Sequence, residues 1–197
     1  MQPQPLLIVI SGLSGAGKDT VVRALHARGF PIHFVVTATS RERRQDEVDG
    51  RDYLFVSKQA FEQMVAEDEL LEYALVYGQY KGVPKEQVRQ ALASGKDVIM
   101  RLDVQGAASI RKQCPGAVLV FLAVSEETLL QRLKDRRTES EEQLQLRLKT
   151  AREELNCIHE FDYLVANENG DLDETVNTIE AIIRAEHHRV MPRRVTL

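Results

Sequence analysis

Residues 6–20, LLIVISGLSGAGKDT, constrain this chain more than any other stretch. An apolar run of strand character ends in a glycine-rich turn with one lysine, and an amphipathic helix pattern with Val21 and Leu25 on one side follows. Glycines let backbone N–H groups turn inward around phosphate oxygens, and the start of the helix adds partial positive charge. The stretch therefore predicts the phosphate-binding loop of nucleoside triphosphate enzymes.

The loop supplies the candidate ATP ligands, which are Gly12, Leu13, Ser14, Gly15, Ala16, Gly17, Lys18, Asp19 and Thr20. Lys18 can neutralise negative charge on the outer phosphates, and it is the first candidate catalytic residue. The general pattern has Ser or Thr directly after the lysine as a Mg²⁺ ligand, whereas this chain has Asp19 followed by Thr20. We therefore expect Mg²⁺ near Asp19 and Thr20. A purely structural glycine turn is the alternative.

Composition limits what the chain can be. Its 197 residues suffice for one full domain, and 43% hydrophobic with 28% charged residues is ordinary for a soluble globular protein. A net charge of −4 provides no global basic field, so we expect no nucleic-acid partner. Cys114 and Cys157 are too few for a disulfide framework or a zinc site. The first apolar run is too short for a signal peptide or a membrane helix, which favours a cytoplasmic protein without a membrane partner.

Strand-like and helical patterns alternate along the chain, which predicts an α/β fold with a mainly parallel sheet. Strands are expected at residues 6–11, 32–36, 70–77, 97–102, 117–123 and 163–166. Helices are expected at residues 18–28, 58–66, 85–93, 105–113, 126–134, 141–157 and 172–189. We expect one domain without internal repeats, and a frayed, solvated tail over residues 191–197.

Two polar segments, residues 37–53 and 135–142, interrupt this alternation. Ligands of α/β proteins bind beyond the carboxyl ends of the strands, so both segments are candidate walls of an active site. The first segment contains Arg41, Arg43 and Arg44, and arginine binds phosphate through two parallel hydrogen bonds. An arginine cluster beside a triphosphate site suggests phosphoryl transfer between two phosphorylated ligands. A charged surface loop is the alternative.

The same segment resembles the signature of the guanylate kinase family, with the pattern Thr39-Ser40-Arg41-x-x-Arg44-x-x-Glu47-x-x-Gly50-x-x-Tyr53-x-Phe55-Val56. The resemblance extends over roughly residues 6–189. It implies a phosphate-binding-loop kinase core at residues 1–36, 84–134 and 143–190, with an inserted GMP-binding subdomain at 37–83. A short lid at 135–142 and a basic tail at 191–197 complete the expected single domain.

The resemblance also implies a reaction: Mg²⁺-dependent transfer of the γ-phosphoryl group of ATP to GMP or dGMP, giving ADP and the nucleoside diphosphate. By position it assigns catalysis to Lys18, Arg41, Arg136 and Arg147, and a contact near the adenine of ATP to Asn167. It assigns the acceptor contacts to Thr37, Arg41, Arg44, Glu47, Tyr53, Glu72, Tyr80, Lys81 and Asp103. Arg147 lies beside the apolar stripe of its expected helix and should point inward.

The residue pattern supports base selection by Glu72 independently. In the expected strand, Glu72 shares a face with Leu70, Ala74 and Val76, and a carboxylate on an apolar face is unfavourable unless a partner satisfies it. Guanine presents two adjacent donors that match a carboxylate, whereas adenine presents an acceptor at N1. A salt bridge to a lysine or arginine is the alternative. Asp103, just past a strand, is a guanine ligand or the N-cap of the next helix, or both.

The chain departs from the family pattern at five positions near the expected site. Asp19 replaces the usual Ser, Thr or Gly, Lys81 a tyrosine that contacts the monophosphate, and Val83 a Ser or Thr that helps to bind the base. Arg101 replaces an acid, and Arg43 replaces a common proline. None of these changes removes a group essential for phosphoryl transfer, but together they bear on GMP affinity, base selectivity and Mg²⁺ binding.

Two other functions stay open from the sequence. One is a related kinase with another acceptor, such as ribose 1,5-bisphosphate phosphokinase, which this chain resembles in the run Gly17-Lys18-Asp19. Glu47, Glu72 and the intact arginine–tyrosine signature weigh against this alternative. The other is a non-catalytic guanylate-kinase-like module that binds phosphorylated peptides. Such modules lose the loop lysine or its glycines, and this chain keeps both.

Overall fold

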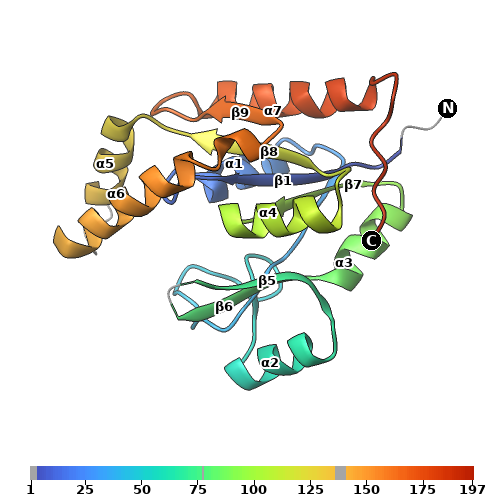
Figure 1. Ribbon diagram of the computed structural model, residues 1–197, viewed down its shortest axis with the longest axis horizontal. Coiled ribbons are helices and arrows are strands. Elements are labelled where there is room, and N and C mark those ends of the chain that lie inside the picture. The colour runs from blue at the N-terminus through green and yellow to red at the C-terminus, as the bar shows by residue number, and fades with distance from the viewer. Residues whose placement is uncertain (1–3, 77, 136–140) are drawn as a thin grey trace.

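The computed structural model describes residues 4–76, 78–135 and 141–197 (Figure 1). Five parallel strands form a central sheet in the order β2-β7-β1-β8-β9. These strands are β1 (Leu7–Gly12), β2 (Ile32–Phe34), β7 (Asp97–Arg101), β8 (Val118–Ala123) and β9 (Tyr163–Ala166). The prediction of an α/β fold with a mainly parallel sheet is confirmed.

Helices cover both faces of this sheet. The helices α1 (Lys18–Ala27) and α7 (Leu172–His187) pack on one face, and α3 (Lys85–Ala93) and α4 (Val104–Gln113) pack on the other. Figure 1 shows α7 and α4 on opposite sides of β1, with α5 (Glu126–Asp135) and α6 (Glu141–Leu155) at one end of the sheet. Within the described residues, no helix is long and apolar enough to cross a membrane.

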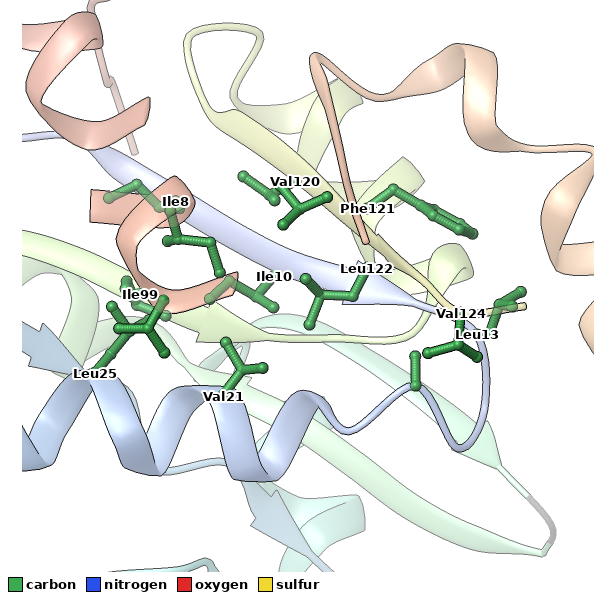
Figure 2. Packing of buried hydrophobic residues seen from close by; sticks show 14 of the residues in the cluster. Ile8, Ile10, Leu13, Val21, Leu25, Ile99, Val120, Phe121, Leu122 and Val124 are labelled. Carbon is green, nitrogen blue, oxygen red and sulfur yellow. The ribbon is translucent and has the colours of Figure 1, made fainter. Parts of the chain in front are cut away.

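The strand β1 reads as a continuous apolar run because both of its faces are buried. Ile8 and Ile10 point toward α1, where Val21 and Leu25 are fully buried against them (Figure 2). Full burial of such a side chain stabilises the fold by roughly 1.5–3 kcal/mol. This packing fixes the start of α1 beside the end of β1, and thereby fixes the position of the loop between them.

A second sheet, in the order β4-β3-β6-β5, lies below the first in Figure 1 together with α2 (Lys58–Ala66). Its strands are β3 (Ala38–Thr39), β4 (Leu54–Phe55), β5 (Leu70–Val76) and β6 (Gln79–Pro84). The sequence analysis expected only β5 of these four. The strands β3 and β4 are two residues long, and β6 mixes glycine, proline and lysine. None of these three strands therefore carries a periodic apolar signal. They form because β6 pairs with both β5 and β3.

The C-terminal tail is not the frayed segment that was expected. Arg193 donates hydrogen bonds to the Glu186 carboxylate and to the backbone oxygen of Ala117, and Val195 packs on the core beneath α3 and α4. The Glu186 side chain is fully buried and also accepts a hydrogen bond from the Tyr163 hydroxyl. A buried carboxylate needs a cationic partner, and the tail supplies it.

Candidate active site

An open cavity of about 710 Å³ lies between the loop after β1, the second sheet and α6. This volume is typical of a small-molecule site. The cavity brings together fifteen of the residues that the sequence predicted: Ser14, Gly15, Gly17, Lys18, Asp19, Thr20, Thr37, Arg41, Arg44, Glu47, Tyr53, Glu72, Lys81, Asp103 and Arg147. Arg136 lies outside the described residues. Gly12, Leu13, Ala16, Tyr80 and Asn167 do not line the cavity.

The glycine-rich loop has a conformation that requires glycine, as Gly12 and Gly17 show. A Cβ on Gly12, which has φ of +128°, would lie 2.1 Å from the backbone oxygen of Leu122. Gly17, the N-cap of α1, has φ of +86°, in the left-handed region. Lys18 Nζ donates hydrogen bonds to the backbone oxygens of Gly12 (2.7 Å) and Leu13 (3.0 Å). Burial lowers the pKa of Lys18, which means that its ammonium is poorly hydrated and suited to a phosphate.

The loop is held from behind by side chains on distant elements. The backbone oxygen of Ala16 accepts hydrogen bonds from Asn167 Nδ2 (2.6 Å) and from Arg132 (3.2 Å). Thr175 donates in turn to Asn167 Oδ1 (3.1 Å). The structure therefore gives Asn167 a supporting contact with the loop, while its contact with adenine stays a prediction. Arg132 is a supporting residue that the sequence analysis missed.

On the opposite wall, Arg41 is held by a carboxylate. Its guanidinium donates to both carboxylate oxygens of Glu47, at 2.6 and 2.7 Å, and its Cζ lies 5.1 Å from the centroid of the Tyr53 ring. The hydrogen bonds from Arg41 lower the pKa of Glu47 to about 2. The backbone N–H of Arg44 also donates to Glu47 (2.9 Å). Glu47 therefore orients Arg41 rather than standing alone as a ligand.

Tyr80 does not enter the cavity. Its ring stacks on Phe61 of α2, with centroids 5.0 Å apart, because alternate residues of β6 face opposite sides of the sheet. The neighbouring residue Lys81 faces the cavity instead. The expected GMP contact of Tyr80 is therefore not supported. The expected contact of Lys81 stays a prediction, and the position of Lys81 in the cavity wall agrees with it.

Glu72 is buried in the cavity wall. It is 7% exposed, and within the described part of the chain its carboxylate accepts no hydrogen bond and forms no ion pair. Burial, and next the nearby charge of Asp103, raise its pKa to about 7. A Cβ on Gly106 would lie 3.1 Å from the carboxylate, so glycine leaves room beside it. The salt bridge that was the alternative for Glu72 is absent from these residues.

A β-bulge in β5 gives Glu72 different neighbours from those that the sequence analysis expected. Leu70 pairs with Pro84 and Glu72 with Val83, so Leu71 is an extra residue in β5. Leu70 therefore packs with Phe61 near α2, whereas Glu72 lines the cavity with Ala74. The expectation that Glu72 shares a face with Leu70 is wrong, and that for Ala74 is confirmed. The side chain of Val76 lies outside the description.

Asp103 has both of the arrangements that the sequence left open. It is the N-cap of α4, because its Oδ1 accepts a hydrogen bond from the Gly106 N–H (2.8 Å). It also lines the cavity beside Glu72. One carboxylate oxygen is thus used by the helix, and the carboxylate can still present its other oxygen to a ligand.

Comparisons with known proteins agree with this geometry. The guanylate kinase family model matches residues 4–186. The chain is 50% identical to guanylate kinase 2, chloroplastic/mitochondrial, of Oryza sativa subsp. japonica, over 99% of this chain and 69% of that protein. It is 45% identical to the guanylate kinase of Caldanaerobacter subterraneus subsp. tengcongensis, over 96% and 92%.

The chain belongs to the guanylate kinase family. The crystal structure of guanylate kinase from Anaplasma phagocytophilum superposes with a TM-score of 0.77 at 26% identity, covering 96% of this chain and 89% of that one. The match includes both sheets of the fold, because it covers nearly the whole chain.

Against this family background, Glu154 is a cavity residue that the sequence analysis did not single out. It comes from α6, and its Oε2 accepts a hydrogen bond from the backbone N–H of Ser14 (2.8 Å). Backbone N–H groups of such loops bind phosphate in nucleotide-binding proteins, so the carboxylate accepts a hydrogen bond from a group that we expect to bind a phosphate oxygen. No local sequence pattern could signal a contact between residues 140 positions apart.

We expect Glu154→Gln to tighten ADP binding by about 3- to 10-fold, because a neutral amide competes less with phosphate for the Ser14 N–H. The loss of the negative charge also leaves Lys18 freer to attract phosphate, since Glu154 raises the pKa of that lysine. Isothermal titration calorimetry with ADP measures the effect. Glu153→Gln is the matched control, because its carboxylate pairs with Lys149 and is 65% exposed. Weaker ADP binding in Glu154→Gln would instead mean that the carboxylate shapes the loop for nucleotide.

Proposed function

We propose how this chain performs the reaction of its family. The chain is an ATP:GMP phosphotransferase, a nucleoside monophosphate kinase that transfers the γ-phosphoryl group of ATP to GMP and yields ADP and GDP. One observation carries this function: a single cavity holds the intact phosphate loop with Lys18 and, on its other wall, the Glu72 carboxylate, which has no partner among the described residues. The first binds a nucleoside triphosphate, and the second matches the two donors of guanine.

We assign the remaining roles from the walls of the cavity. Lys18 and the loop N–H groups hold the phosphates of ATP, and Glu72 and Asp103 accept hydrogen bonds from guanine. Arg41, Arg44 and Tyr53 hold the phosphate of GMP, with Thr37 and Lys81 beside them. Arg147 lines the cavity from α6, which supports assigning it to the transferring group. The role of Arg136 stays a prediction.

The chemistry requires no covalent intermediate on the protein. An oxygen of the GMP phosphate attacks the γ-phosphorus in line, and the bond from that phosphorus to the β–γ bridging oxygen breaks, which releases ADP. Catalysis of such a step is positioning together with neutralisation of charge on the phosphoryl oxygens. Lys18 and Arg41 supply positive charge from opposite walls of the cavity.

Magnesium would enter with ATP and would neutralise charge on its phosphates. Mg²⁺ keeps several waters and uses one or two protein oxygens together with phosphates, so the Asp19 carboxylate and the Thr20 hydroxyl are a sufficient donor set. Asp19 Oδ1 lies 2.6 Å from the guanidinium of Arg101, which leaves the other carboxylate oxygen for the ion or one of its waters. We therefore keep both residues as candidate Mg²⁺ ligands.

A coupled assay of ADP production tests the function. We expect rapid turnover of MgATP with GMP and dGMP, and at most slow turnover with AMP, CMP, UMP or ribose 1,5-bisphosphate. Turnover confined to ribose 1,5-bisphosphate would keep the phosphate loop but contradict the guanine pocket. If ATP bound without turnover of any acceptor, a non-catalytic binding module would become the better explanation.

A further inference from the structure

Arg101 is a cavity residue to which neither the sequence pattern nor the family resemblance gives a role. It ends β7 and pairs in register with Ile10 of β1, so it lies beside the strand that leads into the phosphate loop. Its guanidinium forms an ion pair with Asp19 in the first turn of α1, at 2.6 Å. Both positions depart from the family pattern, and the fold joins the two departures in one contact.

The same guanidinium also faces the acceptor side of the cavity. Its Cζ lies 4.9 Å from the centroid of the Tyr53 ring, the ring that Arg41 approaches at 5.1 Å. Tyr53 is therefore within reach of two arginines, Arg101 at the end of β7 and Arg41 in the loop after β3. Arg101 thus lies between the loop that binds the donor and the group that holds the phosphate of the acceptor.

The charges at this point call for an anion. Lys81 is half-buried and forms no ion pair with any described residue, and burial, followed by the charge of Arg101, lowers its pKa. Arg41 and Arg101 are each balanced by one carboxylate, those of Glu47 and Asp19. A phosphate monoester with two negative charges would balance Lys81 and could accept two hydrogen bonds from an arginine.

We propose that Arg101 binds the 5′-phosphate of the acceptor nucleotide on the side that faces the phosphate loop. Asp19 pairs with the same guanidinium and competes with the acceptor phosphate for it. The proposal rests on the proposed function, because it names a further phosphate ligand in the same site. It makes Arg101 a determinant of affinity for the phosphate of GMP and not for its base.

Calorimetric titration of the full chain with GMP and with guanosine, without ATP or Mg²⁺, separates the affinity for the phosphate of GMP from the affinity for its base. Arg101→Met is expected to weaken GMP binding by about 10- to 100-fold and to leave guanosine binding unchanged. Arg101→Lys keeps the charge but loses the planar fork, so it should recover part of the affinity. In steady-state assays, Arg101→Met should raise the KM for GMP and leave that for ATP unchanged.

Two control variants distinguish ligand binding from other roles. Arg23→Met removes one positive charge from the same cavity. Among the described residues Arg23 donates only to the backbone of its own helix, so GMP affinity should stay within about two-fold. Asp19→Asn frees Arg101, so GMP affinity should stay equal or rise. An equal loss in Arg23→Met would show a general field effect, and an equal loss in Asp19→Asn would show that Arg101 acts only through Asp19; either result overturns the proposal.

Different results would contradict the role of Arg101 and the proposed function of the chain. If the wild-type chain binds GMP and Arg101→Met binds it equally well, only the role of Arg101 is wrong. If the wild-type chain binds neither GMP nor guanosine, the proposed function fails as well. Thermal melting of Arg101→Met and Arg101→Lys confirms that both variants are folded before either result is read.

Discussion

Replacement of Lys18 by methionine is expected to lower kcat for ATP and GMP by about 100- to 1,000-fold, the usual effect of removing one preorganised donor from a charged transition state. The ammonium is buried in the phosphate loop and donates only to the backbone oxygens of Gly12 and Leu13 among the described residues. Methionine fills a similar volume but cannot neutralise charge on the transferred group.

The variant should remain folded, because burial already disfavours the charged lysine and methionine removes that charge. Thermal melting and GMP titration provide the check, and GMP affinity should change by less than about three-fold. Lys112→Met, at an exposed position in the last turn of α4, controls for loss of one lysine. Turnover near the wild-type rate in Lys18→Met would contradict the assignment of the phosphate loop. Replacement by alanine should have at least as large an effect.

Those parts of the fold that carry local signals could be predicted from the sequence. The strand β1 is a continuous apolar run, and the loop after it needs glycine for its conformation. Both features can be seen directly in the sequence, so both were predicted within one residue. The helices α2, α3 and α7 likewise follow apolar periodicity. The signature from Thr39 to Tyr53 placed the arginine group, because its fixed spacing is itself a local signal.

The remaining features depend on contacts between distant residues. The strand β6 exists because it pairs on both sides, and the bulge at Leu71 reverses the side chains that precede Glu72. The hydrogen bond from Ser14 to Glu154 and the ion pair of Arg101 with Asp19 join elements that no spacing rule connects. The prediction of a frayed tail was wrong because the sequence does not show that the Glu186 carboxylate, which pairs with Arg193, is buried.

The second large effect is expected for Glu72→Gln, which should lower kcat/KM for GMP by about 100- to 1,000-fold with little change in the affinity for ATP. Guanine N1–H and the 2-amino group both donate, and an amide nitrogen in place of one carboxylate oxygen presents a donor to a donor. Each lost hydrogen bond to a charged group is worth about 1.5–3 kcal/mol. Initial rates over a matrix of GMP and ATP concentrations separate the two substrates. Equal losses for GMP and ATP would mean that Glu72 is structural.

Glu72 should also leave a signature in the pH dependence of GMP binding. In the free protein its pKa is raised to about 7 by burial and by Asp103, while the two donors of guanine favour the ionised form. GMP binding should therefore release a proton, and affinity should rise as the pH increases from about 6 to 8 and then level off. Because the pKa of the folded state lies above the ordinary value of 4.5, protonated Glu72 also stabilises the ligand-free protein at low pH, and this contribution is lost as the pH rises from 4.5 to about 7. Glu72→Gln should abolish both contributions, which are measured by calorimetry of GMP binding at about pH 6 and 8 and by thermal melting at about pH 5 and 7. A pH dependence that survives in Glu72→Gln would assign the titration to another group.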